Sequence, residues 1–484
     1  MSDPNEGIDV PAGLTGVIAA DTTIGQVRGR EGFYHYRQYD ATELARHRTV
    51  EDVWHLLLHG QLPDAEASVR FGRRVRDARE LPSATRALLP AVAAATTKGA
   101  PLADLRTVAS ALAGQLGFGA SHDLDAATVT DQTIQLAATF PTVVAAIARL
   151  RAGEEAVRVD PDLGLVAGYL QMLTGRPPRD EHVRALERYL VTTIDHGFNA
   201  STFATRVVVS TGADVGSGLI AGLGALSGPL HGGAPSRALD MLDDIGTVDR
   251  AADWARAAVD RGERIMGFGH RVYRTEDPRA ALMRETAIEL GGPRIELALG
   301  VEQAVLEVLA ERKPGRELYA NVEYYAAVVL DAVGLPRELF TSTFAISRAI
   351  GWSAHVVEQH AARKLIRPTA RYVGPPAPEP VPVSGAWSAQ GARRCRSPHR
   401  TSPAVTLRQS RSTVRNTARY GRVCEFEAVP LPKVSGDRTS HSGMVQLSDW
   451  SDRIDRTAKD ANRWVPRPGR RDHDRPGTAY AAVE

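Results

Sequence analysis

Apolar side chains in most of this chain recur at every third or fourth position, the spacing that places them on one face of an α-helix. In residues 49–62 the pattern begins with Thr49 and Asp52, whose spacing resembles a capping box. Strand-like alternation is scarce and is best at residues 26–36. Five more segments share the helical period, with Gly or Pro between them as stop signals: 102–116, 133–152, 180–193, 301–311 and 322–333. The pattern therefore predicts a helical body.

The helical pattern ends near residue 374. Prolines then alternate with small residues, which is typical of a linker: Pro375, Pro376, Pro378, Pro380 and Pro382. In residues 381–484 only 15 of 104 residues are Leu, Ile, Val or Phe, below the roughly 20% that separates disordered from globular chains. We therefore predict a Pro-rich linker and a disordered tail over residues 377–484. This tail is either a solvated extension or sequence from an unintended reading frame or a fused neighbour.

Charge separates the same two parts of the chain. The 484 residues allow two to four domains of about 100–200 residues each, and their net charge is +2. Residues 381–484 carry 19 Lys and Arg against 10 Asp and Glu, a net charge of +9, so residues 1–380 carry −7. The arginines of the tail are scattered with Asp between them, and no nucleic-acid-binding motif accompanies them. We therefore expect no nucleic-acid partner.

The sequence also bears on the cellular compartment. The first 13 residues lack a basic region followed by an apolar one, as a secretory signal would have. No uninterrupted apolar run approaches the roughly 18 residues that cross a bilayer. Both cysteines, Cys395 and Cys424, lie in the tail, so the body uses neither disulfides nor thiolate ligands. These features predict a cytoplasmic protein without a membrane partner.

Three histidines lie in segments that favour a ligand site. His196 precedes a glycine and several small polar residues, and His231 and His270 have glycines close by. Glycine permits unusual backbone angles and lets a ligand approach the main chain. A lone histidine is more often structural, but two glycine-flanked histidines in one chain favour function. The three are far apart in sequence and show no metal-ligand spacing, so we expect no metal site.

Other glycine patterns do not indicate a phosphate loop or a serine nucleophile. Neither GxxxxGK[ST] nor GxSxG occurs in the sequence. Gly218, Gly222 and Gly224 lie in an apolar helical stretch, where they predict close packing of helices.

The C-terminal part of the body adds a carboxylate and two arginines to the candidate residues. Glu323 stands at the start of a helical pattern, and Arg367 follows the last one. A single Glu or Arg is usually a solvated surface group. Arg348 departs from that expectation because apolar residues surround it, so we expect its charge to be paired with a ligand or a carboxylate.

These segments together resemble the citrate synthase family in its shorter bacterial form. The resemblance covers most of residues 14–376 and rests on three blocks in order: GPLHGGA at 228–234, GFGHRVY…DPRA at 267–280, and FxxxR…GWxAHxxEQ at 344–359. It implies an all-α, citrate synthase-like fold with a large domain of residues 1–225 and 324–376 and a small domain of residues 226–323. The site would lie between the two domains, in a cleft that closes on the substrate.

The family condenses acetyl-CoA with oxaloacetate and hydrolyses citryl-CoA, as in the tricarboxylic acid cycle, with no cofactor or metal. That chemistry needs a carboxylate base, a donor to the enol oxygen, and cations for two carboxylates. The motif match implies Glu323 as base, His231 as donor and His270 as the group that polarises the oxaloacetate carbonyl. It implies that His196, Arg279 and Arg348 bind oxaloacetate. For CoA it implies a contact by Arg274 and a loop close to the nucleotide that contains Ile265, Gly267 and Gly269. It also implies a homodimer in which Arg367 enters the partner's site.

Two departures from the family pattern leave alternatives open. Glu323 replaces the family's Asp, and a misplacement of about 1 Å can cost about a hundredfold in rate. Pro235 begins a Pro-Ser-Arg run where the family has Asn-Glu, and proline suits the first turn of a helix. One alternative is a 2-methylcitrate synthase that uses propionyl-CoA, since a pocket discriminates one methylene only about 10–200-fold. The other is a non-catalytic paralogue that binds oxaloacetate or CoA.

Overall fold

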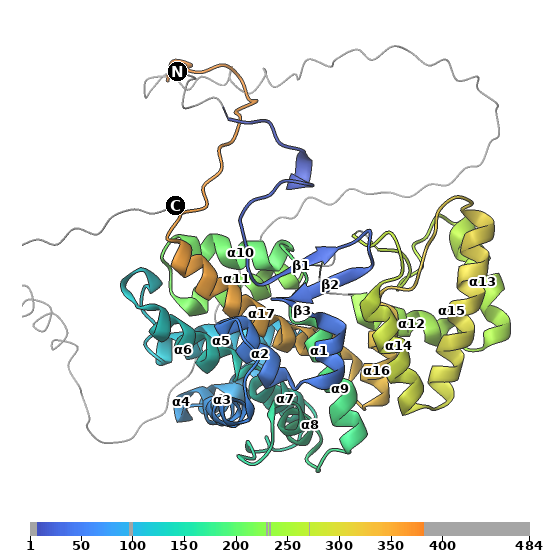
Figure 1. Ribbon diagram of the computed structural model, residues 1–484, viewed down its shortest axis with the longest axis horizontal. Helices are drawn as coiled ribbons and strands as arrows, with labels where there is room; N and C mark the ends of the chain where they lie inside the picture. The colour runs from blue at the N-terminus through green and yellow to red at the C-terminus, as the bar shows by residue number, and fades with distance from the viewer. Residues whose placement is uncertain (1–6, 96–99, 229–230, 232–233, 271, 382–484) are drawn as a thin grey trace, which may run out of the picture. The chain divides into compact units, whose positions relative to one another are not determined.

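Helices make up almost all the regular structure of this chain (Figure 1). The computed structural model describes residues 7–95, 100–228, 231, 234–270 and 272–381, so the predicted disorder of the tail beyond Val381 lies outside the described residues. The helices are α1 (Ala41–His47), α2 (Val50–His59), α3 (Ala65–Ala78), α4 (Ser83–Ala95), α5 (Pro101–Gln115), α6 (Ala126–Ala137), α7 (Phe140–Arg151), α8 (Leu165–Thr174), α9 (Asp180–Thr193), α10 (Ala200–Ser210), α11 (Val215–Leu226), α12 (Ala234–Ile245), α13 (Val248–Asp260), α14 (Pro278–Leu290), α15 (Pro293–Arg312), α16 (Val322–Ala332) and α17 (Phe340–Ala362).

Local sequence signals explain where several helices begin and end. The Thr49 hydroxyl accepts a hydrogen bond from the Asp52 N–H (3.2 Å) at the start of α2, and Gly60 ends this helix with φ of 80°. The six predicted helical segments all fall on helices, and α9 has the predicted bounds. The segment 133–152 is not one helix, however. It divides into α6 and α7 because Pro141 cannot donate the backbone bond of a continuing helix and instead lies in the first turn of α7.

A small antiparallel sheet forms where the sequence shows its best strand-like alternation. Its strands, in the order β1-β2-β3, are β1 (Gly25–Arg28), β2 (Phe33–Tyr36) and β3 (Tyr39–Asp40). The strand-like alternation at residues 26–36 covers two strands rather than one, because the chain reverses at residues 29–32, where Gly32 has φ of 63°. The Tyr34 hydroxyl donates to the Thr192 carbonyl (3.1 Å), and the Tyr36 hydroxyl contacts both the carbonyl and the N–H of Asp195. The sheet thus holds the chain just before His196.

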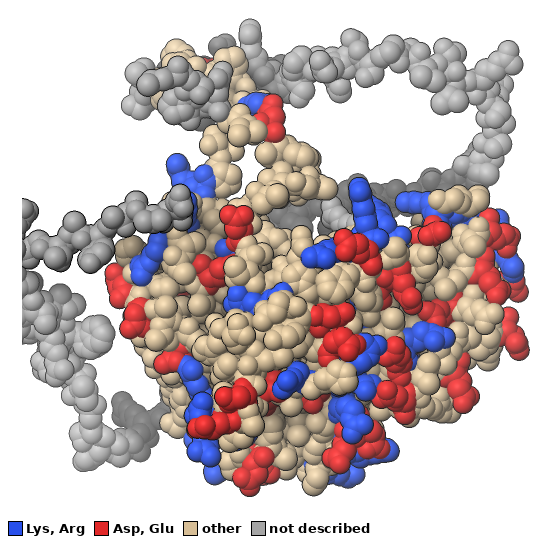
Figure 2. All heavy atoms as spheres, viewed as in Figure 1, with Lys and Arg blue, Asp and Glu red and all other residues tan. Residues whose placement is uncertain are grey.

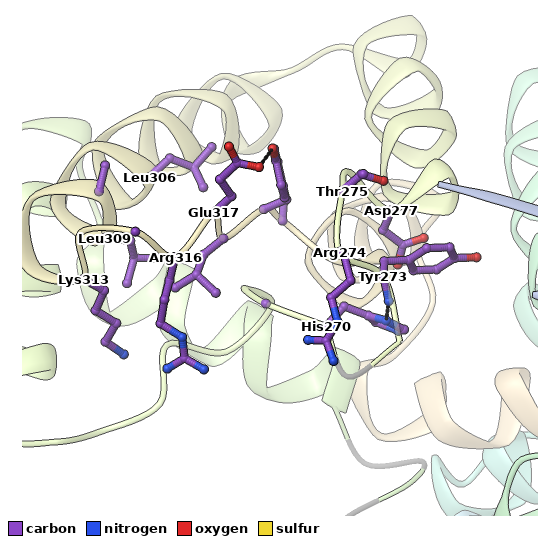
Figure 3. A pocket seen from close by; sticks show the side chains of 16 residues that line it. His270, Tyr273, Arg274, Thr275, Asp277, Leu306, Leu309, Lys313, Arg316 and Glu317 are labelled. Carbon is purple, nitrogen blue, oxygen red and sulfur yellow. Dashed lines mark hydrogen bonds between the residues drawn. The ribbon is translucent and has the colours of Figure 1, made fainter. Parts of the chain in front are cut away.

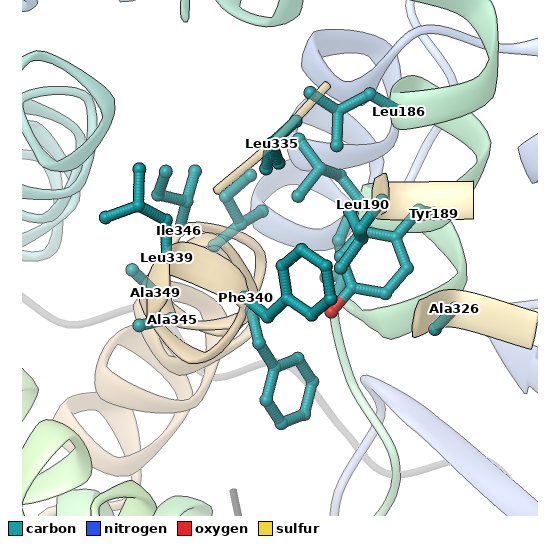
Figure 4. Packing of buried hydrophobic residues seen from close by; sticks show 14 of the residues in the cluster. Leu186, Tyr189, Leu190, Ala326, Leu335, Leu339, Phe340, Ala345, Ile346 and Ala349 are labelled. Atoms are coloured by element: carbon teal, nitrogen blue, oxygen red, sulfur yellow. The ribbon is translucent and has the colours of Figure 1, made fainter. Parts of the chain in front are cut away.

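The core surrounds α17, the longest helix. It packs against α2, α6, α9, α10 and α11, and nearly every residue from Phe340 to Val356 is buried. Most of these side chains are apolar, as is typical of a buried helix, although Arg348 and His355 are buried among them. Figure 4 shows Phe340 on α17 beside Tyr189 and Leu190 on α9. At the end of α9, a Cβ on Gly351 would lie 2.2 Å from the Ile194 carbonyl oxygen, so only glycine permits this close approach.

The glycines of α11 serve helix packing, as predicted, at two of three positions. A Cβ on Gly218 would lie 2.6 Å from a Val209 methyl, and one on Gly222 would lie 2.9 Å from the Trp352 ring. A Cβ on Gly224 would have no neighbouring atom within 4 Å, so this glycine plays no such role. The first two glycines bring α11 against α10 and α17.

Residues to Ala377 form one compact unit, and the predicted division into large and small domains stays a prediction. Helices α12 to α15 gather on one side of this unit (Figure 1). Ion pairs join α14 to the helices of the N-terminal part: Arg46 with Glu285 (2.7 Å) and Arg188 with Glu289 (2.6 Å).

Acidic and basic side chains are interspersed over the face seen in Figure 2. The stretch 126–151 has the length and apolarity of a membrane span, but 78% of its apolar window is buried, as in a core helix.

Candidate active site

Seven of the predicted site residues line one cavity of about 280 Å³. They come from loops after α9, before α12 and before α14, and from the helices α14, α16 and α17. The seven are His196, His231, Gly269, His270, Arg279, Glu323 and Arg348. The fold thus brings together side chains that are up to 152 positions apart in sequence.

Arg348 is a buried cation without a complete set of partners. Its side chain projects from α17, the residue is 3% exposed, and its guanidinium lies 4.8 Å from the centre of the Phe344 ring. The Nε and Nη1 atoms have no hydrogen-bond partner among the described residues. Burial lowers the pKa of Arg348, and the charge of Asp195 opposes this shift. Because an unpaired buried charge is costly, this guanidinium fits an anionic ligand in the cavity.

Arg279 forms the second cationic group of the cavity, and a carboxylate holds it. Its Nε and Nη2 atoms donate to the two oxygens of Asp277 at 3.0 and 2.8 Å. Burial acts against the charge of Arg279, but the Asp277 carboxylate outweighs it and raises the pKa of Arg279 above its usual value. Asp277 also caps α14, because its Oδ1 accepts the Arg279 N–H.

His270 is held as a neutral ring with a defined tautomer. Its Nδ1 accepts hydrogen bonds from the backbone N–H groups of Val272 (3.0 Å) and Tyr273 (2.9 Å). The ring proton therefore lies on Nε2, and Nη2 of Arg279, which can only donate, lies 3.1 Å from Nε2 without accepting this proton. Burial, together with Arg279, lowers the pKa of His270 to about 4. Near neutral pH this ring can donate one hydrogen bond from Nε2.

His231 and His196 are also kept uncharged by their surroundings. Burial, aided by Arg348, lowers the pKa of His231 to about 4, and its Nε2 lies 2.8 Å from the Ser201 hydroxyl. Burial, aided by Arg279, lowers the pKa of His196 well below its usual range. The Nε2 of His196 lies 3.1 Å from the Tyr273 hydroxyl. All three histidines of the cavity are therefore neutral hydrogen-bonding groups at pH 7.

Glu323 lies in the first turn of α16, and a neighbouring loop is tied to that turn. The Asn321 side chain accepts the Glu323 N–H (3.0 Å) through Oδ1 and donates from Nδ2 to the Gly269 carbonyl (2.9 Å). Gly267 accepts the Asn321 N–H (2.8 Å) and needs to be glycine, because its φ is 82° and a Cβ would lie 2.8 Å from Tyr324. Burial raises the pKa of Glu323 to about 7, although Arg279 counteracts it. A carboxylate of that pKa is matched to proton transfer near neutral pH.

Two further cavities adjoin the first and share Gly269 and His270 with it. One of about 900 Å³ contains Arg274, and one of about 370 Å³ contains Ile265. Figure 3 shows Lys313 and Arg316 on one side of the larger cavity and Arg274 and His270 on the other. Three basic residues that belong to none of the sequence motifs line these spaces: Arg264, Lys313 and Arg316.

Two predicted residues do not line any of these three cavities. Gly267 supports the loop through its backbone rather than forming a cavity wall. Arg367 lies exposed in the segment after α17. Its assignment to a partner's site stays a prediction.

For several residues of the site, the sequence indicates a helix cap but not a role in the site. Ser201 and Asn199 belong to one capping pattern, because the Asn199 Oδ1 accepts the N–H groups of Ser201 and Thr202 at the start of α10. That pattern identifies a helix start but not a contact with His231. Asp277 is likewise readable as a cap, whereas its pairing with Arg279 depends on side-chain geometry. Among the described residues, no group of three or more His, Cys, Asp or Glu side chains is arranged to hold a metal ion.

One cavity of this helical fold holds two arginines, three neutral histidines and a carboxylate. Such a site is typical of enzymes that bind small anionic substrates and transfer protons. The sequence profile described as "Citrate synthase, C-terminal domain" matches residues 13–369. The chain belongs to the citrate synthase family, whose enzymes are acyltransferases.

Individual relatives agree with this assignment. The Citrate synthase of Haloferax volcanii is 38% identical over 375 residues, covering 76% of this chain and 96% of that protein. The Citrate synthase 2 of Bacillus subtilis is 35% identical over 381 residues, covering 77% of this chain and 98% of that protein. A structure of the Thermoplasma acidophilum citrate synthase in a ternary complex with carboxymethyl coenzyme A and oxaloacetate is similar with a TM-score of 0.70 and 28% identity, covering 78% of this chain and 99% of that one.

Proposed function

We propose that this protein is a citrate synthase that condenses acetyl-CoA with oxaloacetate and hydrolyses citryl-CoA to citrate and CoA. The observation that carries the proposal is the incompletely paired guanidinium of Arg348, buried in the same cavity as the Glu323 carboxylate. A dicarboxylate would complete the hydrogen bonds of that guanidinium. Arg279 and His196 would bind the rest of oxaloacetate, with His270 donating from Nε2 to its carbonyl oxygen.

In the first step, the Glu323 carboxylate removes a proton from the methyl group of acetyl-CoA. The electron pair of the broken C–H bond moves toward the thioester oxygen, and His231 stabilises the resulting enolate oxygen with a hydrogen bond. For His231 to donate from Nδ1, the Ser201 hydroxyl has to direct its proton to Nε2, and the 2.8 Å contact between these atoms supports that arrangement.

In the second step, the enolate carbon attacks the carbonyl carbon of oxaloacetate and a C–C bond forms. The π electrons of the carbonyl move to its oxygen, which takes a proton from Nε2 of His270, and the proton that Glu323 removed from the methyl group restores the neutral ring, which gives citryl-CoA. Water then attacks the thioester carbon and the C–S bond breaks, leaving a carboxylate, the thiol of CoA and one proton that passes to solvent. No step requires a metal or a cofactor, because the CoA thioester is itself the activated substrate.

The two adjoining cavities would hold CoA. Arg264, Arg274, Lys313 and Arg316 supply positive charge around them, and CoA carries phosphate groups that such side chains bind. The shared lining residues Gly269 and His270 would place the thioester end next to Glu323.

We further propose a cytoplasmic homodimer that acts in the tricarboxylic acid cycle, with Arg367 entering the partner's site. Apolar residues that are exposed near both ends of the body support association: Ile18 is 86% and Val373 is 88% exposed. A mass in solution near twice the 52.1 kDa of the chain would support the dimer.

The assay that tests the proposed function measures release of the CoA thiol with oxaloacetate and either acetyl-CoA or propionyl-CoA. A higher kcat/KM for acetyl-CoA identifies a citrate synthase, and a higher value for propionyl-CoA identifies a 2-methylcitrate synthase. Binding of oxaloacetate without thiol release from either thioester would favour the non-catalytic paralogue. Glu323, in place of the family's Asp, is the feature that suggests this alternative.

The pH dependence of the reaction follows from Glu323. The base has to be ionised, so we expect kcat/KM for acetyl-CoA to rise with pH and to level off above about 7, the raised pKa of Glu323. His231 and His270, with pKa values lowered to about 4, stay neutral over this range and add no inflection. Rates measured between pH 5.5 and 9 check this, and a flat profile between pH 5.5 and 8 would contradict it.

Removal of the tail is expected to leave catalysis intact. All cavity residues and the core lie within the unit that ends at Ala377. A chain that ends at Val381 should therefore keep its kcat/KM within about twofold and its Tm within a few degrees. Assays and thermal unfolding of both forms provide the comparison, and loss of activity on truncation would show that the tail has a function. An intact mass of the natural protein near 52.1 kDa would count against a spurious tail.

A further inference from the structure

A buried row of polar side chains runs behind the candidate site, outside the cavity lining. It consists of Asp195, His355, Arg206 and Glu358, from the loop after α9 and from α10 and α17. Asp195, His355 and Arg206 are 3%, 1% and 2% exposed. His355 and Glu358 belong to the GWxAHxxEQ block, for which the proposed chemistry gives no role.

The hydrogen bonds fix the protonation of His355. Arg206 can only donate, so its Nη1 donates to Nδ1 of His355 (3.2 Å). The ring proton then lies on Nε2, which donates to Oδ1 of Asp195 (3.1 Å). A neutral His355 thereby links the buried cation of Arg206 to the buried carboxylate of Asp195, and in both hydrogen bonds a donor faces an acceptor.

The Asp195 end of the row shapes the turn that carries His196. Oδ2 of Asp195 accepts the Gly197 N–H (3.2 Å), and Gly197 has φ of 62°. Burial acts to raise the pKa of Asp195, but His355 and Arg348 outweigh it and the pKa is lowered. Asp195 is thus a buried anion that supports the charge of Arg348 while holding the backbone on both sides of His196.

The other end anchors Arg206 to the end of α17. Arg206 forms an ion pair with Glu358 and donates from Nε to Oε1 of Gln359 (3.0 Å). Glu358 in turn accepts the backbone N–H of Thr23 (2.7 Å), next to β1. A lysine cannot reproduce these contacts, because it lacks the planar fork of a guanidinium.

We propose that His355 and Arg206 are positioning residues for oxaloacetate: through Asp195 they hold His196 and support Arg348 in the geometry that binds the dicarboxylate. The inference rests on the proposed function and adds two residues that do not touch the substrate. A loss of this support should weaken oxaloacetate binding more than acetyl-CoA binding, because neither residue lines the cavities with Arg274 and Lys313.

The test compares the wild-type protein with His355→Phe and Arg206→Lys, and uses Arg79→Lys as a matched control. Arg79 is another fully buried arginine, but it donates to the carbonyls of Gly164 and Leu163, away from the site. Calorimetry gives the Kd for oxaloacetate, thiol release gives KM for both substrates, and thermal unfolding monitors the fold. Turnover by the wild type tests the proposed function separately.

We expect Kd and KM for oxaloacetate to rise about 10–100-fold in both variants, with KM for acetyl-CoA within about threefold of wild type. Arg79→Lys should lower Tm without raising KM for oxaloacetate more than KM for acetyl-CoA. Unchanged oxaloacetate binding in the folded variants, or an equal rise in Arg79→Lys, would overturn the inference. If His355→Phe does not fold, Arg206→Lys against Arg79→Lys decides the question.

Discussion

Glu323→Gln is expected to lower kcat for acetyl-CoA by about 10²–10⁴-fold, the usual contribution of a positioned general base. Glutamine has nearly the shape of glutamate but cannot accept the methyl proton. KM for oxaloacetate should change little, because Arg348, Arg279 and His270 remain. Steady-state thiol release, with an independent oxaloacetate Kd, measures both effects.

The same variant should be more stable than the wild type at pH 8. The folded protein binds a proton at Glu323 more tightly than the unfolded chain does, since burial raises the pKa from 4.5 to about 7. Ionised Glu323 therefore destabilises the fold above about pH 7, and this cost disappears below about pH 4.5. Removing the charge should raise the free energy of unfolding by about 1–3 kcal/mol at pH 8. Full turnover by Glu323→Gln would exclude Glu323 as the base.

Arg348→Leu is expected to lower kcat/KM for oxaloacetate by about 10²–10⁴-fold, through KM above all. The change removes charge-assisted hydrogen bonds to the substrate, worth about 1.5–3 kcal/mol each. The stability of the unliganded protein should not fall, because Nε and Nη1 of Arg348 have no partner among the described residues. Thermal unfolding with and without oxaloacetate separates the two effects, because oxaloacetate raises the Tm only of a protein that binds it.

Arg316→Leu serves as the matched comparison for that variant. Arg316 lines the two adjoining cavities but not the cavity of Arg348. We expect it to raise KM for acetyl-CoA and to leave KM for oxaloacetate near the wild-type value. If Arg348→Leu and Arg316→Leu affected both substrates alike, the assignment of one cavity to each substrate would be wrong.

The helices were largely predictable from sequence because their signals are local. Thr49 and Gly60 mark the ends of α2, and the apolar period of residues 180–193 coincides with α9. The sheet and the break between α6 and α7 were less evident. A turn at residues 29–32 and a proline at the start of a helix interrupt patterns that otherwise look continuous.

The site was predictable where motifs mark it and not where it depends on tertiary contacts. The resemblance indicated seven of the residues that line the 280 Å³ cavity, including its histidines, its carboxylate Glu323 and the arginines Arg279 and Arg348. Nothing in the order of residues indicates that Ser201 meets His231 or that Arg206 reaches His355, because these pairs lie 30 and 149 positions apart. Lys313 and Arg316 resemble ordinary surface residues, and only the cavity beside them distinguishes them.

The most direct test of the central claim is thiol release by the purified full-length protein with oxaloacetate and acetyl-CoA. We predict release that requires both substrates, with kcat in the usual enzymatic range of about 1–10³ per second and citrate formed in equal amount. Binding of oxaloacetate with no thiol release above the uncatalysed rate would contradict it, and would leave a protein with the family's fold but without its chemistry.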